Sequence, residues 1–287
     1  MKFRIAFCGT SEIAVPFLDY FLDDPRFEVV FIMTKYDDPR KKGRYTVYRH
    51  LIGSNLTIYT PNKMKEVDDK LFEGLDASIV ISYGHKIPNR MLAKTSWINM
   101  HGSLLPDLRG ASPIQHAILY GYEMTGMTST IMVEDIDAGP IIDQLQLAIE
   151  YNDTFATLAK KMSTIGPAWF ADSVHSYLSG TIKAIPQDNS LATFAPIITD
   201  SYRMLDWNKT ATQLYNQIRA LNPDPCCIVK VDGVQLKVLE SKVVENLDNK
   251  KHLIFPCKES YLRLTRIIPM SGKPMSDEEW LRGKQQI

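Results

Sequence analysis

An amide and an imidazole stand two residues apart in the run Asn99-Met100-His101-Gly102. If this run ends a β-strand, Asn99 and His101 project from the same face, because successive side chains of a strand alternate. Gly102 then lets the backbone turn tightly and approach a ligand. A hydrogen-bond donor and a titratable ring held together at a loop mouth can stabilise a developing negative charge or move a proton.

A carboxylate could join this pair from the loop of residues 135–140, which reads Asp-Ile-Asp-Ala-Gly-Pro. Both features have plainer explanations. A lone histidine in a strand is commonly a core residue, and an aspartate before a small residue and a glycine suits a tight turn. Asn99, Gly102 and the acidic loop together favour the functional interpretation. Asp137 placed over Asn99 and His101 would fix the tautomer of the imidazole.

Three other segments that follow expected strands carry weaker signals. The run Gly9-Thr10-Ser11-x-x-Ala14 occupies the place of a dinucleotide fingerprint, but Ser11 and Ala14 replace two of its glycines, so we expect no nicotinamide site. Residues 82–88 form either a strand-to-helix turn or a backbone-lined ligand slot. Residues 35–44 end in a basic run that is either a solvated surface or a site for nucleic-acid phosphates.

The elements that would position these segments alternate between strand and helix. Short apolar stretches separated by helical spacing predict a mostly parallel sheet covered on both faces, in the Rossmann-like α/β class. We expect strands at residues 3–8, 28–33, 56–59, 77–82, 96–100, 127–133 and 141–149, and helices at 13–22, 47–51, 64–72 and 113–119. Ligands of such sheets bind at the carboxyl ends of the strands, where Asn99 and His101 would lie.

The second half of the chain changes in character. Residues 155–178 predict a long amphipathic helix interrupted near Gly166-Pro167, and residues 181–206 predict a surface linker. A helix at 210–221 precedes short strands at 226–231, 234–239, 253–255 and 261–268, the first two joined by the hairpin signal Asp232-Gly233. We therefore expect a catalytic domain at 1–182, a linker at 183–205 and a small, OB-like β-barrel at 206–287.

Composition excludes several classes of protein. The chain has 287 residues, a formal net charge of zero and four cysteines. No C-x-x-C pair and no paired histidine spacing occurs, so we expect no metal. No apolar run approaches the roughly 18 residues of a membrane span, and the apolar stretch near Met1 is too short for a signal peptide. We expect a cytoplasmic monomer with no membrane partner.

Several motifs together resemble the methionyl-tRNA formyltransferase family, a branch of the folate-dependent formyltransferases. Residues 99–106 (Asn-Met-His-Gly-Ser-Leu-Leu-Pro) are followed at 109–115 by Arg-Gly-Ala-Ser-Pro-Ile-Gln. Ser82-Tyr83-Gly84 and Asp137-Ala138-Gly139 fit the family in order and spacing. Later motifs, among them Ile-Arg-Ala-Leu-Asn-Pro at 218–223, extend the resemblance over nearly the whole chain.

The resemblance implies that 10-formyltetrahydrofolate, without a metal, gives its formyl group to the α-amine of methionine on initiator methionyl-tRNA. It implies catalytic roles for Asn99, His101 and Asp137. The implied folate contacts are Ser103, Leu104, Leu105 and Pro106, with Tyr83, Gly84, His85, Lys86, Ile87 and Pro88 lining the pterin slot. The tRNA would bind the C-terminal barrel and a basic loop, shorter than is usual in the family, that carries Arg40, Lys41, Lys42 and Arg44.

Two alternatives to this reaction remain. The acceptor could be an amino-sugar nucleotide, or the chain could be a non-catalytic RNA-binding or folate-sensing protein that keeps the fold. The Arg-Gly-Ala-Ser-Pro-Ile-Gln run favours the tRNA branch over the sugar branch. The intact Asn99, His101 and Asp137 argue against a protein without catalysis.

Overall fold

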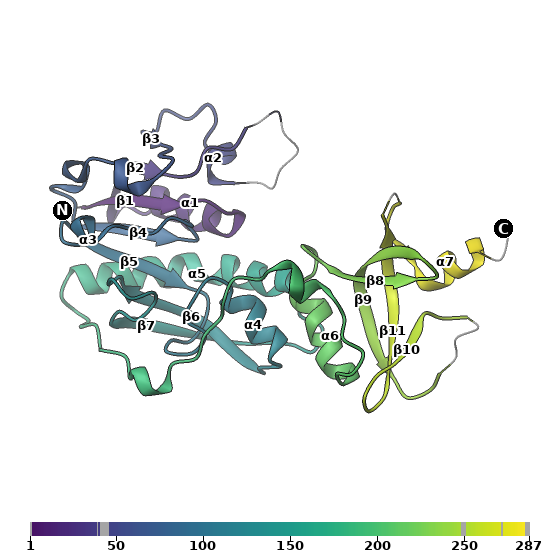
Figure 1. Ribbon diagram of the computed structural model, residues 1–287. Helices are drawn as coiled ribbons and strands as arrows, with labels where there is room; N and C mark the ends of the chain where they lie inside the picture. Colours follow the sequence, from purple (N-terminus) through teal and green to yellow (C-terminus); the bar gives the residue numbers. More distant parts are fainter. Residues whose placement is uncertain (1, 39, 41–45, 248–250, 271, 285–287) are drawn as a thin grey trace. The chain divides into compact units, whose positions relative to one another are not determined.

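A computed structural model describes residues 2–38, 40, 46–247, 251–270 and 272–284 (Figure 1). Its contacts divide the chain into two compact units. Unit 1 contains residues 1–110, 125–147 and 159–194, and unit 2 contains residues 111–124, 148–158 and 195–287. Among the described residues, no helix combines the length and the apolar character that crossing a membrane requires.

Unit 1 is built on a seven-stranded sheet (Figure 1). From one edge to the other its strands are β3 (Ile58–Tyr59), β2 (Phe27–Met33), β1 (Phe3–Gly9), β4 (Ala77–Ile81), β5 (Ser96–His101), β6 (Met124–Ile131) and β7 (Ile141–Ala148). Pairing is parallel from β3 to β5 and antiparallel between β5 and β6. The predicted mostly parallel sheet is therefore confirmed, although β3 is shorter than expected.

The interior strand β1 shows why its sequence is apolar without a break. Ile5 and Phe7 face one side of the sheet, and Ala6 and Cys8 face the other; all four are fully buried. The ring of Phe7 lies 6.3 Å from that of Phe21, whereas Ala6 and Cys8 belong to a separate apolar cluster on the opposite face. A strand buried on both faces needs apolar residues at every position.

Helices α1 (Val15–Asp23) and α5 (Phe155–Leu178) cover the first face, with α1 preceded by the turn η1 (Glu12–Ala14). The ring of Phe170 meets the rings of Phe17 and Phe21 edge-on at 6.1 Å. The expected interruption near Gly166-Pro167 is wrong, because α5 continues through both residues. Proline removes one backbone hydrogen bond of the helix, and the helix packs closely here, since a Cβ at Gly166 would lie 2.6 Å from Phe17.

Short helical turns cover the opposite face: η2 (Met64–Glu66), η3 (Asp69–Phe72) and α3 (Asn89–Leu92). The single helix expected at 64–72 is thus wrong. The Asp68 side chain accepts the backbone N–H of Lys70, which starts η3 anew and separates it from η2. Met64, Phe72 and Trp97 pack in the core beneath these turns. The short helix α2 (Val47–His50) lies where a helix was expected.

The segment at 181–206 is irregular, as predicted, apart from the turns η4 (Asn189–Leu191) and η5 (Asp200–Arg203). Its first part adds to the edge of the sheet in unit 1. Ile185 and Ile141 exchange two backbone hydrogen bonds of 2.8 and 2.7 Å. The linker is therefore tied to unit 1 by main-chain pairing at β7.

Unit 2 combines two packed helices with an antiparallel sheet. Helix α4 (Pro113–Leu119) packs on α6 (Ala211–Ala220). The five-stranded sheet runs β10 (Ile254–Pro256), β11 (Tyr261–Pro269), β9 (Val234–Val244) and β8 (Cys227–Val231), with β12 (Met275–Ser276) paired to β11. This curled sheet confirms the predicted small, OB-like C-terminal fold (Figure 1).

Helix α7 (Asp277–Lys284) closes unit 2 and was not expected from the sequence. A signal for it exists. The N–H of Ser276 donates to Glu279 Oε2 at 2.8 Å, and the N–H of Glu279 donates to Ser276 Oγ at 3.2 Å. This reciprocal pair is the capping box that a Ser-x-x-Glu sequence encodes.

Replacing Thr210 by alanine is expected to destabilise the protein by about 1 kcal/mol, because it removes the cap of α6. Thr210 Oγ1 accepts the N–H of Gln213, whose side chain in turn accepts the N–H of Thr210. Denaturant unfolding of Thr210→Ala and of the control Thr210→Ser checks this. Equal losses in the two variants would contradict a role for the hydroxyl.

Candidate active site

Strand β5 places Asn99 and His101 at the carboxyl edge of the sheet in unit 1. Asn99 pairs with Val80 of β4 on one side and with Thr130 of β6 on the other. His101 is 5% exposed, so its imidazole is nearly removed from water. Both side chains approach the same carboxylate, that of Asp137, which shows that they share a face of the strand.

The carboxylate of Asp137 lies between the two groups. Its Oδ1 is 3.5 Å from Asn99 Nδ2, and its Oδ2 is 3.6 Å from His101 Nδ1. The backbone N–H of Gly110 donates to Oδ2 at 2.9 Å. A fixed backbone donor thus holds the carboxylate, while the amide makes a long hydrogen bond to it and the imidazole stands slightly beyond hydrogen-bond length, as catalytic groups often do without substrate.

The orientation of His101 follows from one contact. Its Nε2 lies 2.9 Å from the carbonyl oxygen of Leu108. A carbonyl only accepts, so Nε2 carries the ring proton in this contact. Nδ1 therefore faces Asp137 either as a lone pair or, once the ring is protonated, as a second donor. The imidazole can exchange a proton at Nδ1 without turning.

Backbone strain gathers around this site. Three residues other than glycine have left-handed backbones there, namely Ser82 (φ 48°), Leu108 (φ 59°) and Asp137 (φ 52°). Leu108 presents the carbonyl that holds His101, and Asp137 presents the carboxylate. Such conformations cost free energy and persist where the surroundings fix them, commonly at functional sites. Sequence reasoning missed Leu108 and Gly110, because both act through backbone groups.

The segment predicted to contact folate, residues 103–106, is fastened to the sheet. Thr128 Oγ1 donates to the Ser103 carbonyl at 2.7 Å and accepts the Leu105 N–H at 3.0 Å. Leu105 is buried, and Leu104 packs over Gly126, where a Cβ would lie 2.4 Å from the leucine side chain. Pro106 is partly exposed. This segment is a rigid rim beside His101.

The second predicted folate segment, residues 82–88, follows β4, the strand next to β5. Tyr83 and Ile87 are buried in the core, whereas Gly84 and Lys86 are exposed, and His85 and Pro88 are partly buried. Thr10 Oγ1 donates to the Tyr83 carbonyl, and Lys35 Nζ donates to the Gly84 carbonyl. Burial, and secondarily the charge of Lys35, lower the pKa of His85, so its ring is neutral near pH 7.

The basic loop is described only in part. Arg40 is exposed, and its guanidinium donates two hydrogen bonds of 3.0 Å to the Asp38 carboxylate. Hydrogen bonding to Arg40 lowers the pKa of Asp38. Surface pairs of this kind contribute little to stability, so Arg40 can exchange Asp38 for another anion at small cost. Lys41, Lys42 and Arg44 lie outside the described residues.

Gly139→Ala is expected to destabilise the loop that carries Asp137. A Cβ at this position would lie 1.6 Å from the carbonyl oxygen of Ile131, so the loop must move. Overpacking costs about 1–3 kcal/mol, and the displaced carboxylate should lower kcat as well. In the control variant Gly283→Ala, the added Cβ has no atom within 4 Å. Thermal unfolding and turnover measured for both variants check this, and a Gly139→Ala protein with unchanged kcat would contradict it.

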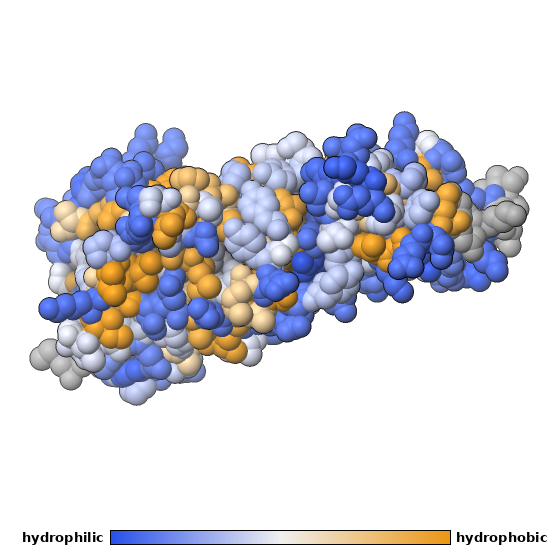
Figure 2. Space-filling model, turned by 90° about the horizontal axis from the view of Figure 1, so that it is seen from below, coloured by the Kyte–Doolittle hydropathy of each residue, from blue (hydrophilic) through white to orange (hydrophobic). Residues whose placement is uncertain are grey.

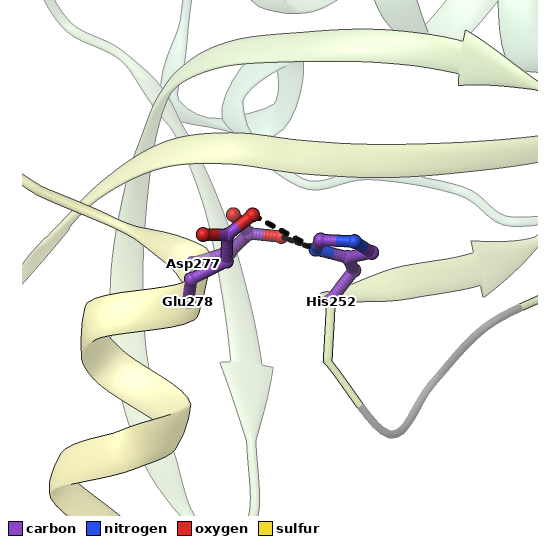
Figure 3. Close-up of side chains that lie close together, drawn as sticks. All are labelled: His252, Asp277 and Glu278. Atoms are coloured by element: carbon purple, nitrogen blue, oxygen red, sulfur yellow. Dashed lines mark ion pairs between the residues drawn. The ribbon is translucent and has the colours of Figure 1, made fainter.

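A cluster of His252, Asp277 and Glu278 in unit 2 has the composition of a metal site (Figure 3). Its potential ligand atoms lie within 4.8 Å of one another. However, Arg263 donates to both oxygens of Asp277 at 2.9 and 3.0 Å and to Glu278 at 2.9 Å. A cation would have to displace this guanidinium. The cluster instead fastens the start of α7 to β11.

Comparison with known proteins decides the family. The formyl transferase model matches residues 2–174, and the model of the formyl transferase C-terminal domain matches residues 197–285. The chain belongs to the formyl transferase family. It is 36% identical to a methionyl-tRNA formyltransferase of Bacillus pumilus, over 98% of this chain and 94% of that protein. It is 33% identical to the methionyl-tRNA formyltransferase of Bacillus subtilis over the same shares.

Solved structures share the formyl transferase fold at lower identity. WlaRD, a sugar 3N-formyl transferase solved with dTDP and 5-N-formyl-THF, has a TM-score of 0.74 at 18% identity, covering 95% of this chain and 100% of that one. HypX from Aquifex aeolicus in complex with tetrahydrofolic acid has a TM-score of 0.69 at 15% identity, covering 97% of this chain and 46% of that one. These likenesses support the fold, and the sequence relatives place this formyl transferase in the tRNA branch.

Proposed function

We propose that the chain transfers a formyl group from 10-formyltetrahydrofolate to the α-amine of methionine on initiator methionyl-tRNA. The observation that carries the proposal is the meeting of Asn99, His101 and Asp137 at one sheet edge in a chain that aligns end to end with methionyl-tRNA formyltransferases. An amide, an imidazole and a carboxylate are the groups that acyl transfer to an amine needs.

Asn99 is proposed to stabilise the negative charge that develops on the formyl oxygen. Attack of the amine nitrogen on the formyl carbon turns the carbonyl into an oxyanion. Asn99 Nδ2 can keep one hydrogen toward Asp137 and offer its second to this oxygen. Removing one such donor from an enzyme typically costs about 10²–10³ in rate.

Asp137 and His101 are proposed to move the proton. The attacking amine must lose a proton, and the Asp137 carboxylate can accept it directly or through water. His101 Nδ1, 3.6 Å away, can take up that proton and share the charge with Asp137, because its Nε2 stays bound to Leu108. The nitrogen that leaves with the folate product needs a proton in return, and the same pair can supply it.

Residues 82–88 and 103–106 are proposed to hold the folate, because they follow the paired strands β4 and β5 at the carboxyl edge of the sheet. The buried Nε2 of His85 has no hydrogen-bond partner among the described residues, and the polar ring of a pterin could satisfy it. The backbone at Ser103 and Leu105, which is held by hydrogen bonds to Thr128, is proposed to supply a second, rigid contact surface. Backbone that is already fixed would bind a ring without a large ordering cost.

Apolar surface beside Asp137 is proposed to receive the methionine side chain. Ile136 directly precedes Asp137 and is 70% exposed, and Phe194, which bridges to Arg109, is 66% exposed. Figure 2 shows apolar side chains gathered on the surface of unit 1. The C-terminal sheet of unit 2, Arg40 and the basic residues beyond it are proposed to contact the tRNA phosphates.

The test offers the protein two acceptors with 10-formyltetrahydrofolate: initiator methionyl-tRNA and a dTDP-linked amino sugar. We expect formyl-methionine on the tRNA and no formylated sugar. Formylation of the sugar alone would replace the proposal with its alternative. A protein that formylates neither acceptor would contradict both.

A further inference from the structure

Gln187 reaches across 50 residues of sequence to the loop that carries Asp137. Its side-chain Nε2 donates to the carbonyl oxygen of Asp137 at 2.8 Å and to that of Gly139 at 2.6 Å. Both hydrogens of the amide are therefore used on one turn of backbone. These bonds hold the loop on either side of Ala138, directly beside the left-handed Asp137.

Arg109 fixes which way the Gln187 amide points. Arg109 Nε and one terminal nitrogen donate to Gln187 Oε1 at 3.1 and 2.6 Å, and the same terminal nitrogen donates to Asn189 at 2.8 Å. A guanidinium only donates, so the Gln187 oxygen must face it and the amide hydrogens must face the loop. Arg109 is 7% exposed, so water competes little for these bonds.

The same short segment also holds the Asp137 carboxylate. Gly110 follows Arg109, and its N–H donates to Asp137 Oδ2 at 2.9 Å. Arg109 therefore orients the Gln187 amide that binds the backbone of Asp137, and the next residue, Gly110, binds the Asp137 side chain. The segment Arg109-Gly110 thus holds both the backbone and the carboxylate of Asp137, and this fixes the position of the carboxylate relative to Asn99 and His101.

We propose that Gln187 and Arg109 are positioning residues that hold Asp137 in its reactive geometry. This inference rests on the proposed function, because it assumes that Asp137 takes part in the formyl transfer. Neither side chain hydrogen-bonds Asn99 or His101 in the described part of the chain. Their effect must therefore reach the reaction through the loop at 137–139.

The sharpest variant is Gln187→Glu. It preserves the shape of the side chain and still accepts from Arg109, but it replaces two donors by an oxygen that repels the carbonyls of Asp137 and Gly139. We expect kcat to fall about 10- to 100-fold with KM for both substrates within about 3-fold, because a displacement of about 1 Å costs up to about 100-fold. The kcat of Gln187→Ala should fall by a similar factor.

Two controls separate positioning from general damage. Ser190→Ala alters an exposed residue of the same segment whose hydroxyl donates to Asp188, and it should leave kcat unchanged. In the background of Asp137→Asn, Gln187→Glu should have almost no further effect, because the group that it positions has already been replaced. Full additivity of the two losses would overturn the inference, as would Gln187→Glu with wild-type kcat.

A measurement that does not depend on formyl transfer tests the positioning of Asp137 separately from the reaction. Amide hydrogen exchange at Gly110 reports the bond to Asp137 and should accelerate at least about 10-fold in Gln187→Glu but not in Ser190→Ala. Unchanged exchange would overturn the inference even if the protein formylates no tRNA. An inactive wild type with accelerated exchange in the variant would instead contradict the proposed function and leave the positioning of Asp137 supported.

Discussion

Asp137→Asn is expected to lower kcat for formyl transfer by about 10²–10⁴ while the fold stays intact. The asparagine oxygen can still accept the N–H of Gly110, and asparagine tolerates the left-handed backbone that Asp137 adopts at φ 52°. What the variant lacks is the negative charge and the site for the amine proton. The substitution should therefore lower kcat.

The matched control for this variant is Asp135→Asn, which makes the same chemical change at an exposed position two residues earlier. Steady-state kinetics with methionyl-tRNA, together with thermal unfolding, should show a normal Asp135→Asn enzyme and a folded Asp137→Asn enzyme with strongly reduced kcat. Near wild-type turnover in Asp137→Asn would contradict the proton-transfer role.

Asn99→Ala and His101→Ala are each expected to reduce kcat by about 10²–10³, and the double variant should lose less than the product of the two factors. Both side chains face the carboxylate of Asp137, and the oxyanion and the loss of the amine proton that they are proposed to assist belong to the same attack. His101→Ala also leaves the carbonyl of Leu108 without its partner, so this variant should lose some stability as well.

A double-variant cycle at saturating substrates measures this coupling, with circular dichroism showing that each protein is folded. Independent action of the two residues would make the losses multiply. That outcome would mean that Asn99 and His101 serve different steps of the reaction.

Much of the fold was predictable because local and tertiary preferences agree. The unbroken apolar run in β1 reflects burial on both faces, and the spacing of Asn99 and His101 reflects the alternation of β5. Asp232 and Gly233 both adopt positive φ values, 47° and 83°, as a two-residue hairpin turn between β8 and β9 requires. In each case the signal and the constraint lie within a few residues.

The remainder depended on contacts that no short window of sequence contains. Helix α5 continues through Pro167, and the Gly166 beside it lies against Phe17, which is far away in the chain. Asp137 was predictable as a carboxylate in a glycine-containing turn, but its hold by Gly110 and Gln187 was not, because backbone donors and distant amides leave no motif. The capping box at Ser276 is different, because its pattern was present in the sequence and marks α7.

The most direct test is a single-turnover experiment with 10-formyltetrahydrofolate that carries an isotope label in its formyl group. Excess wild-type protein is mixed with initiator methionyl-tRNA, and the label is located by mass spectrometry after quenching. We predict label on the α-nitrogen of methionine, formed rapidly by the wild type and at least about 100-fold more slowly by Asp137→Asn. Label that never reaches this nitrogen, or reaches it equally fast in both proteins, would contradict the account.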